Sequence, residues 1–338
     1  MEAQATQVCR EDIVFVAWSR LSLRTRFLAE EIGAHLLFVG GRPPYLENWY
    51  KTRKELERLE PRIVFVQLPQ GPLLFAMLRL ARRRRLHVVA DVHTGFAHPV
   101  SLAEKMLNAP FRRLLYRCSL VLVHNEPLRN YLLAKGFSHT NNTIVVYDPI
   151  GRLQAKMEPY KYVEPGQYIL VPASWAYDEP LEFMVREYTM SRIYEKWGYK
   201  LVITGNHRRR EKLAKQIANV KGVILTGFVP DTTYQWLVAN AALVIVATTR
   251  EYTMLRAVWD AALHETLVVV SMTNTLEVEV PTPCMFNYRE GSLASILEPC
   301  IENEEWRSQT KQTLKELKKR SIQRLENLKV RLKELLET

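Results

Sequence analysis

The feature that most constrains the fold is an alternation of short apolar segments with helical segments, which occurs twice along the chain. The first series predicts strands at residues 13–17, 36–38, 63–67, 88–91, 120–124 and 144–146. The second predicts strands at residues 168–172, 200–204, 222–226, 242–247 and 267–271. These segments are rich in valine and isoleucine and carry few polar residues, which is typical of parallel strands covered by helices on both faces of the sheet. Between the first two strands, Ser22 is the predicted N-cap of a helix and Gly33 its predicted stop.

A polar stretch at residues 154–167 separates the two series. A chain of 338 residues exceeds what one compact core usually holds. We therefore expect two doubly wound α/β domains, residues 1–155 and 156–300, which face each other across a cleft. Ligands of such sheets bind beyond the carboxyl ends of the strands, so the residues that follow each strand are the candidates for a site.

Residues 301–338 have no strand pattern. Leu325, Leu328, Leu332 and Leu335 recur at steps of three and four residues, which predicts a long amphipathic C-terminal helix with a narrow leucine seam. We expect this seam to pack against the protein. The alternatives are pairing with a second copy of the chain, which would make a homo-oligomer, and contact with a membrane surface.

The four cysteines, Cys9, Cys118, Cys284 and Cys300, lie far apart and form no C-x-x-C pair. This spacing argues against a zinc site or a disulfide framework and favours a reducing compartment. The N-terminus lacks a basic segment followed by an apolar one, and no apolar run approaches ~18 residues. We therefore expect a cytoplasmic protein.

The formal net charge of +11 favours a polyanionic partner: nucleic acid, anionic lipid or a phosphorylated small molecule. The charge is concentrated in residues 79–87 and 112–117, where basic residues lie beside apolar ones on predicted helices. This pattern suits peripheral attachment to the anionic inner face of a membrane, and the alternative is a solvated helix face. Nucleic-acid binding is less favoured, because neither interleaved aromatic residues nor a recognised motif accompanies the charge.

The segment TTREYTMLRAVWDAALHETLVVVS, residues 248–271, is the strongest candidate for a site. It follows a predicted strand, and Thr253 is the predicted N-cap of a helix that begins at Met254. A capping box would place Glu or Gln at the third helical position, where Arg256 stands instead. The first-turn amides therefore remain able to bind an anion, with Arg250 or Arg256 adding charge, and a diphosphate fits this site.

Two acidic residues flank that predicted anion site. Asp260 lies two helical turns past Thr253, about 10 Å along the axis, which matches the distance from a diphosphate to the ribose of one nucleotide. Glu251 lies in the loop on the other side, where a donor sugar would bind. The alternative interpretation is a capped helix with solvated acids.

The segment resembles the donor-binding segment of retaining glycosyltransferases of the two-domain GT-B fold, family four. That family has an E-x7-E pair before a strand similar to LVVVS here. The resemblance implies that Glu251 binds hydroxyls of the donor sugar and that Asp260 binds the ribose. This chain departs from the pattern in two ways, since the spacing is one residue longer and the second acid is Asp. The resemblance covers most of residues 12–290.

Further donor-side residues follow two other strands of the second series. The turn Gly227, Phe228 and Val229 resembles the one that receives the nucleotide base, since glycine permits close approach to backbone amides. The alternative is an ordinary strand-to-helix turn. The predicted donor-binding residues are Thr204, Gly205, Gly227, Phe228, Val229, Arg250, Tyr252, Thr253, Met254, Arg256 and Asp260.

The segment PASWAYDEPLEF, residues 172–183, departs most from the family. Many relatives carry Arg and Lys near this segment, whereas this chain has Asp178 and Glu179. Asp178 is either part of the site or the cap of a helix. The resemblance then implies that positive charge for a diphosphate comes from elsewhere, and the candidates are Arg250, Arg256, Arg20 and Arg24.

On the acceptor side, VVADVHTGFAHP, residues 88–99, resembles the D-x-H stretch beside the reaction centre of the family. The predicted catalytic residues are therefore Glu251, His93 and Asp91. The stretch HNEP, residues 124–127, follows the next strand, and Asn125 and Glu126 there either belong to the site or start a helix.

These features predict a hexosyltransferase that uses a nucleotide-diphosphate sugar and a glycan or lipid-linked acceptor. The resemblance implies retention of anomeric configuration, with the leaving diphosphate relaying the acceptor's proton; inversion would require Asp91 or His93 as general base. No D-x-D signature is present, so we expect neither a metal nor another cofactor. The alternatives are a nucleotide-sugar epimerase or hydrolase on the same fold and a basic nucleic-acid-binding protein.

Overall fold

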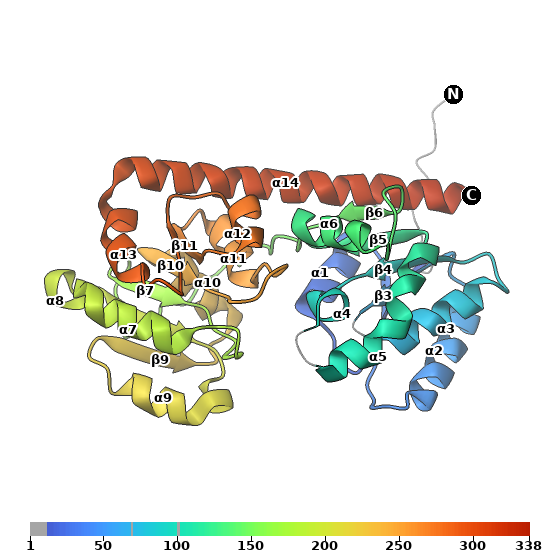
Figure 1. Ribbon diagram of the computed structural model, residues 1–338, viewed down its shortest axis with the longest axis horizontal. Coiled ribbons are helices and arrows are strands. Elements are labelled where there is room, and N and C mark those ends of the chain that lie inside the picture. Colours follow the sequence, from blue (N-terminus) through green and yellow to red (C-terminus); the bar gives the residue numbers. More distant parts are fainter. Residues whose placement is uncertain (1–11, 69, 100–101) are drawn as a thin grey trace. The chain divides into compact units, whose positions relative to one another are not determined.

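The computed structural model describes residues 12–68, 70–99 and 102–338 (Figure 1). The chain divides into two compact units. The N-terminal domain comprises the residues up to Pro149 together with Ser321–Thr338, and the C-terminal domain comprises Ile150–Arg320.

The N-terminal domain is a parallel six-stranded sheet in the order β2-β1-β3-β4-β5-β6. Its strands are β1 (Ile13–Trp18), β2 (His35–Val39), β3 (Ile63–Gln67), β4 (His87–Asp91), β5 (Leu120–Val123) and β6 (Thr143–Val145). The helical segments are α1 (Leu23–Glu31), α2 (Leu46–Leu59), α3 (Gly71–Ala81), α4 (Thr94–Ala97), α5 (Leu102–Arg112), η1 (Arg113–Arg117) and α6 (Glu126–Ala134). All six predicted strands are present, and the apolar side chains of β1, β3, β4 and β5 form the buried core of the domain.

Helix α1 begins and ends where the sequence predicts. The Ser22 side chain accepts a hydrogen bond from the amide of Thr25, and Gly33 follows the helix with a φ of 66°. A left-handed residue just past a helix end is readily supplied by glycine, which has no Cβ to collide with the backbone.

The C-terminal domain contains a second six-stranded parallel sheet, in the order β12-β11-β10-β7-β8-β9. Its strands are β7 (Tyr168–Val171), β8 (Lys200–Thr204), β9 (Val223–Gly227), β10 (Leu243–Val246), β11 (Val268–Ser271) and β12 (Met285–Phe286). The helical segments are α7 (Leu181–Ser191), α8 (Ile193–Trp197), η2 (His207–Arg210), α9 (Glu211–Ala218), α10 (Asp231–Ala239), α11 (Arg256–His264), α12 (Asn274–Glu279) and α13 (Leu293–Glu302). The sequence did not predict β12, because two residues are too few to show a periodic pattern.

The predicted C-terminal helix is α14 (Glu304–Glu337) (Figure 1). Leu328 and Leu332 of its leucine seam are buried in the core of the N-terminal domain, and Leu325 and Leu335 pack at the edge of that core. The expectation that the seam packs against the protein is therefore confirmed. In the part of the chain that the structure describes, no helix is both long and apolar enough to cross a membrane.

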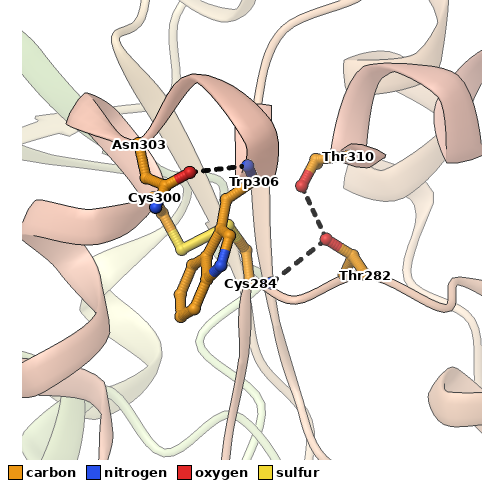
Figure 2. Close-up of a disulfide and its surroundings, with 6 residues drawn as sticks. All are labelled: Thr282, Cys284, Cys300, Asn303, Trp306 and Thr310. Atoms are coloured by element: carbon orange, nitrogen blue, oxygen red, sulfur yellow. Dashed lines mark hydrogen bonds between the residues drawn. A yellow bond between two sulfur atoms is a disulfide. The ribbon is translucent and has the colours of Figure 1, made fainter. Parts of the chain in front are cut away.

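Figure 2 shows a disulfide between Cys284, which precedes β12, and Cys300 in α13. Both cysteines are fully buried, and Trp306 packs against the same cluster. The prediction that the cysteines form no disulfide is wrong for this pair, because the chain folds back to bring together residues 16 positions apart. Cys118 is free and buried, and burial raises the pKa of its thiol. Cys9 lies outside the described residues.

Candidate functional site

The centre of the C-terminal sheet is a topological switch point. Strands β7 and β10 lie side by side there, and the chain leads away from them in opposite directions, through β8 and β9 on one side and β11 and β12 on the other. Ligands of doubly wound sheets bind outside the carboxyl ends of the strands at such a point. The loops that follow β7 and β10 are therefore the first place to look for a site.

Asp178 joins these two loops. Its carboxylate accepts a hydrogen bond from the Thr248 hydroxyl at 3.0 Å, and its carbonyl oxygen accepts one from the amide of Thr249 at 2.8 Å. Helix α7 begins only at Leu181, with Pro180 in the cap position. The alternative in which Asp178 caps that helix is therefore wrong, and the residue fixes the two loops at the switch point.

Glu179 occupies a ring of donors within the loop after β7. The carboxylate is 5% exposed and accepts hydrogen bonds from the Ser174 amide and hydroxyl and from the Trp175 amide, at 2.7–3.1 Å. Burial raises the pKa of Glu179 above its ordinary value, although the hydrogen bonds oppose the shift. The Glu179 carboxylate therefore occupies the position at these amides that an anionic ligand could otherwise take. The sequence singled out Glu179 as unusual but did not indicate this role.

Glu251 lies in the turn after β10 and faces the start of α12. Its carboxylate accepts hydrogen bonds from the amides of Asn274 and Thr275, at 3.2 and 3.3 Å, and from the Thr275 hydroxyl at 3.1 Å. The amide of Tyr252 donates to the same hydroxyl at 2.7 Å. Tyr252 has a φ of 58°, a left-handed conformation that costs a non-glycine residue about 1 kcal/mol. Contacts with α12 thus fix both the turn and the Glu251 carboxylate, whose sugar contact stays a prediction.

The helix after this turn starts later than predicted. Helix α11 begins at Arg256, and Leu255 is in the N-cap position without a side-chain hydrogen bond. The prediction that Thr253 caps the helix is wrong, because its hydroxyl donates to the carbonyl of Glu251 within the turn, and Met254 is buried. Leu255 supplies no side-chain acceptor for the first amides of the helix. The predicted anion site therefore consists of the amides from Arg256 onward.

Arg256 and Asp260 form an ion pair one helical turn apart on α11, with Arg256 Nε 3.0 Å from the carboxylate. The Tyr234 hydroxyl of α10 donates to the same carboxylate at 2.9 Å. Burial, and secondarily the charge of Asp260, raises the pKa of Tyr234 well above its ordinary value. The prediction placed Asp260 within reach of a ribose; in the structure its side chain is 14% exposed and held by these two neighbours.

The predicted glycines at the ends of β8 and β9 are both in the left-handed region. Gly205 has a φ of 89°, and a Cβ there would lie 1.8 Å from the carbonyl oxygen of Ala173. Gly227 has a φ of 69° but has room for a Cβ, since its nearest neighbour would be the His207 ring at 3.7 Å. The Gly205 amide donates to the Gly227 carbonyl at 2.9 Å, which joins the two strand ends.

Around these glycines, the other predicted residues differ in exposure. Thr204 is buried, and its carbonyl accepts a hydrogen bond from the Trp175 indole at 2.9 Å. Phe228 is 84% exposed, so its ring is available to a flat partner such as a base. Val229 is half-buried.

His207 begins a basic run, residues 207–210, which forms η2 after β8. Its ring lies beside Gly227 and edge-on to Trp175, with ring centroids 6.0 Å apart. Two arginines of the same run donate to carbonyls of the loop after β7, Arg209 to Ser174 at 3.1 Å and Arg210 to Glu179 at 3.4 Å. In a sequence, a run of basic residues indicates a solvated helix face. The structure shows instead that two of these arginines donate hydrogen bonds to the loop after β7.

In the N-terminal domain, Asp91 ends β4 and is fully buried. Arg24 of α1 donates from Nε to one carboxylate oxygen at 2.9 Å, and His93 Nε2 lies 3.4 Å from the other. Burial alone would raise the pKa of Asp91, but the charges of Arg24 and His93 outweigh it and hold the pKa well below the usual range. The predicted pair of Asp91 and His93 is therefore in contact, with the acid ionised beside the imidazole.

Arg24 Nη1 also lies 2.9 Å from the carboxylate of Asp148. One buried carboxylate, Asp91, and one partly exposed carboxylate, Asp148, therefore neutralise this guanidinium within the N-terminal domain. Arg24 was one of four candidates to supply charge to a diphosphate, and in the structure its guanidinium is engaged by Asp91 and Asp148. Arg20 remains exposed.

His124 follows β5 and lies close to this cluster. Its Nε2 is 3.1 Å from the Thr94 hydroxyl, and its ring centroid is 6.2 Å from that of His93. Burial, together with the charge of Arg24, lowers the pKa of His124 to about 4, so the imidazole is neutral at neutral pH. Asn125 caps α6 by accepting a hydrogen bond from the Leu128 amide, which confirms the helix-start alternative for that residue.

Comparisons with known proteins agree with this architecture. Residues 11–150 match the family model described as Glycosyltransferase Family 4. Among curated proteins, none matches the sequence significantly. The solved structures of similar fold include Anabaena HepE in complex with UDP and glucose, with a TM-score of 0.70 at 13% identity over 96% of this chain and 99% of HepE.

Two further solved structures have the same fold. A glycosyltransferase from Rickettsia africae has a TM-score of 0.72 at 12% identity, and a sucrose-phosphate synthase from Thermosynechococcus elongatus has a TM-score of 0.71 at 13% identity. Each alignment covers 96% of this chain and 98% of the other. The chain therefore has the GT-B fold, with two Rossmann-like domains and a long C-terminal helix.

Proposed function

We propose that this chain is a glycosyltransferase that moves a sugar from a nucleotide-diphosphate donor, bound by the C-terminal domain, to an acceptor bound by the N-terminal domain. The observation that carries the proposal is the match of residues 11–150 to the family-four glycosyltransferase model. Independent support comes from the other domain, where residues 248–271 resemble the donor-binding segment of the same family and lie at the switch point of their sheet.

A uridine diphosphate sugar is the first candidate donor, because HepE was solved in complex with UDP and with UDP-glucose. The base would stack near Phe228, and the diphosphate would meet the uncapped start of α11 with Arg250 and Arg256 beside it. Glu251 would then bind hydroxyls of the sugar. Its carboxylate, already oriented by Asn274 and Thr275, keeps acceptor capacity beyond the three hydrogen bonds that it makes.

On the acceptor side, we assign His93 to the transfer site and Asp91 to its support. A buried carboxylate with a lowered pKa and a guanidinium partner is a poor proton acceptor, so we assign Asp91 the role of orienting His93. We propose retention of anomeric configuration without a metal, in which the leaving diphosphate receives the acceptor's proton. Should the product be inverted, His93 would be the general base, with Asp91 as the group that orients it.

The test is the transfer activity of Glu251 variants with a UDP-hexose. Glu251→Ala should abolish transfer and lose a small part of the stability, about 1 kcal/mol for each of the hydrogen bonds to α12. Glu251→Gln retains one acceptor oxygen for those donors, so it should restore part of the stability without restoring transfer. Glu182→Ala, at an exposed acid in the first turn of α7, is the matched control and should behave as wild type.

Transfer by Glu251→Ala at the wild-type rate would refute the donor-site assignment. The alternative of an epimerase or hydrolase on the same fold predicts donor turnover when no acceptor is present. Incubation of the donor alone, followed by analysis of the sugar released or isomerised, separates that alternative from a transferase.

A further inference from the structure

Helices α3 and α5 of the N-terminal domain pack side by side (Figure 1). A Cβ on Gly71 of α3 would lie 2.2 Å from the ring of Phe111 in α5, so the contact is close. These helices lie on the connections from β3 to β4 and from β4 to β5, which run across the sheet in one direction. Right-handed crossovers in one direction place their helices on the same face of the sheet, so the outer sides of α3 and α5 face the same way.

The outer sides of these helices expose large apolar side chains. Leu102, Met106 and Leu107 of α5 are 72%, 70% and 70% exposed, and Phe75 of α3 is 49% exposed. Leu102 and Met106 are one helical turn apart and therefore adjacent on the helix surface. Isolated apolar side chains at a surface are ordinary, but a cluster on neighbouring helices marks an interaction surface.

Basic residues are interspersed with these apolar ones. Phe75, Arg79 and Arg82 recur at steps of four and three residues and so share one side of α3 and its end. Arg113 and Arg117 follow α5 in η1 and are exposed. Residues 70–86 contain no acidic residue, and residues 102–117 contain one, Glu104. Among the described residues, no carboxylate pairs with Arg79, Arg82, Arg113 or Arg117.

We propose that this α3–α5 surface, made of Phe75, Leu102, Met106 and Leu107 with Arg79, Arg82, Arg113 and Arg117, docks onto an anionic lipid membrane. Aliphatic side chains enter the boundary between headgroups and acyl chains, while arginines bind the lipid phosphates. A nucleic acid would meet the arginines but leave Leu102 and Met106 in water. A second copy of the chain would bring two surfaces of the same charge together.

The surface adjoins the predicted acceptor side within the same domain. His93 is in the N-cap position of α4, and Arg112, the last residue of α5, donates from Nε to the carbonyl of Phe96 in α4 at 3.0 Å. A membrane bound at α3–α5 would therefore lie close to α4, the helix that follows His93. The docking proposal itself does not depend on the enzymatic one, since it rests on exposure and charge alone.

Vesicle flotation with the full chain tests the proposal. Wild-type protein should float with vesicles that contain 30% phosphatidylglycerol at low salt, float less at high salt, and stay in solution with pure phosphatidylcholine, since screening weakens the arginine contacts. The variant Leu102→Ser/Met106→Ser and the variant Arg82→Glu/Arg113→Glu should each reduce binding roughly tenfold or more.

Matched controls on other helices of the domain are Leu46→Ser, an exposed leucine of α2, and Arg26→Glu, an exposed arginine of α1. Both should bind as wild type. The thermal midpoint of every variant establishes that it is folded. The proposal is overturned if wild type fails to float with anionic vesicles at low salt, if it binds neutral vesicles equally, or if the surface variants bind no more weakly than the controls. Binding of duplex DNA without vesicle flotation would equally overturn it.

Discussion

The guanidinium of Arg24 lies 2.9 Å from the carboxylate of Asp91, and both side chains are buried at the carboxyl end of the N-terminal sheet. Arg24 bridges Asp91 to Asp148, while the second oxygen of Asp91 contacts His93. Arg24, in the first turn of α1, thus connects this helix to the end of β4 and to the segment that follows β6.

The first prediction concerns the cost of removing this arginine. Arg24→Met keeps the apolar stem but removes the guanidinium partner of the fully buried Asp91 carboxylate, which should lower the free energy of unfolding by about 3–5 kcal/mol. Arg26→Met, at an exposed position of the same helix, should change it by less than about 0.5 kcal/mol. Urea denaturation measures both. Equal stability of the two variants would show that the buried network contributes nothing.

The second prediction is a pH dependence that originates at His124. Its pKa falls from 6.5 to about 4 on folding because burial disfavours the charged ring. The unfolded chain therefore binds a proton between these pH values that the folded chain does not, so stability is complete above pH 6.5 and decreases as the pH falls toward 4. Since the ring keeps some exposure to solvent, we expect a loss of about 2 kcal/mol, less than the full shift would give.

Replacement of that histidine isolates its contribution. His124→Gln should flatten the stability profile between pH 4 and 6.5. Asp91 acts in a different range: its folded pKa is lowered, so its stabilisation persists above its ordinary value of 3.8 and disappears only at lower pH. An unchanged profile in His124→Gln would assign the pH dependence to another group.

The third prediction compares two glycines that share a conformation but differ in their surroundings. Gly205→Ala should cost about 3 kcal/mol or more, because the left-handed strain of about 1 kcal/mol is joined by a collision with the Ala173 carbonyl. Gly227→Ala has room for its methyl group and should cost only the strain, about 1 kcal/mol. Denaturation of both variants provides the measurement, and equal losses would contradict the steric argument.

Much of the fold was predictable from the sequence, because buried parallel strands leave a local pattern of valine and isoleucine. All eleven predicted strands are present, and Ser22 caps α1 as expected. Strand β12 and the pairing of Cys284 with Cys300 were missed, since both depend on contacts between distant parts of the chain. A two-residue strand is defined by its pairing with a neighbouring strand, here β11. A disulfide forms only where the folded chain brings two cysteines together.

The candidate site was predictable in its position but less so in its contacts. The predicted roles of Glu251, Asp91 and His93 rest on residue type after each strand and stay predictions. The partners of these residues were not, because Thr275 reaches Glu251 from α12 and Arg24 reaches Asp91 across the sheet. The cap assigned to Thr253 failed for a related reason, since the turn uses its hydroxyl before the helix begins.

The central claim is that the C-terminal domain binds a nucleoside diphosphate at the start of α11, and calorimetric titration with UDP measures this directly. We expect one saturable site per chain. Arg256→Ala should weaken binding about tenfold, because it removes a charged contact to phosphate, whereas exposed Arg208→Ala should leave it unchanged. Absence of saturable binding for UDP and for the other nucleoside diphosphates, or equal binding by the Arg256→Ala variant, would contradict the claim.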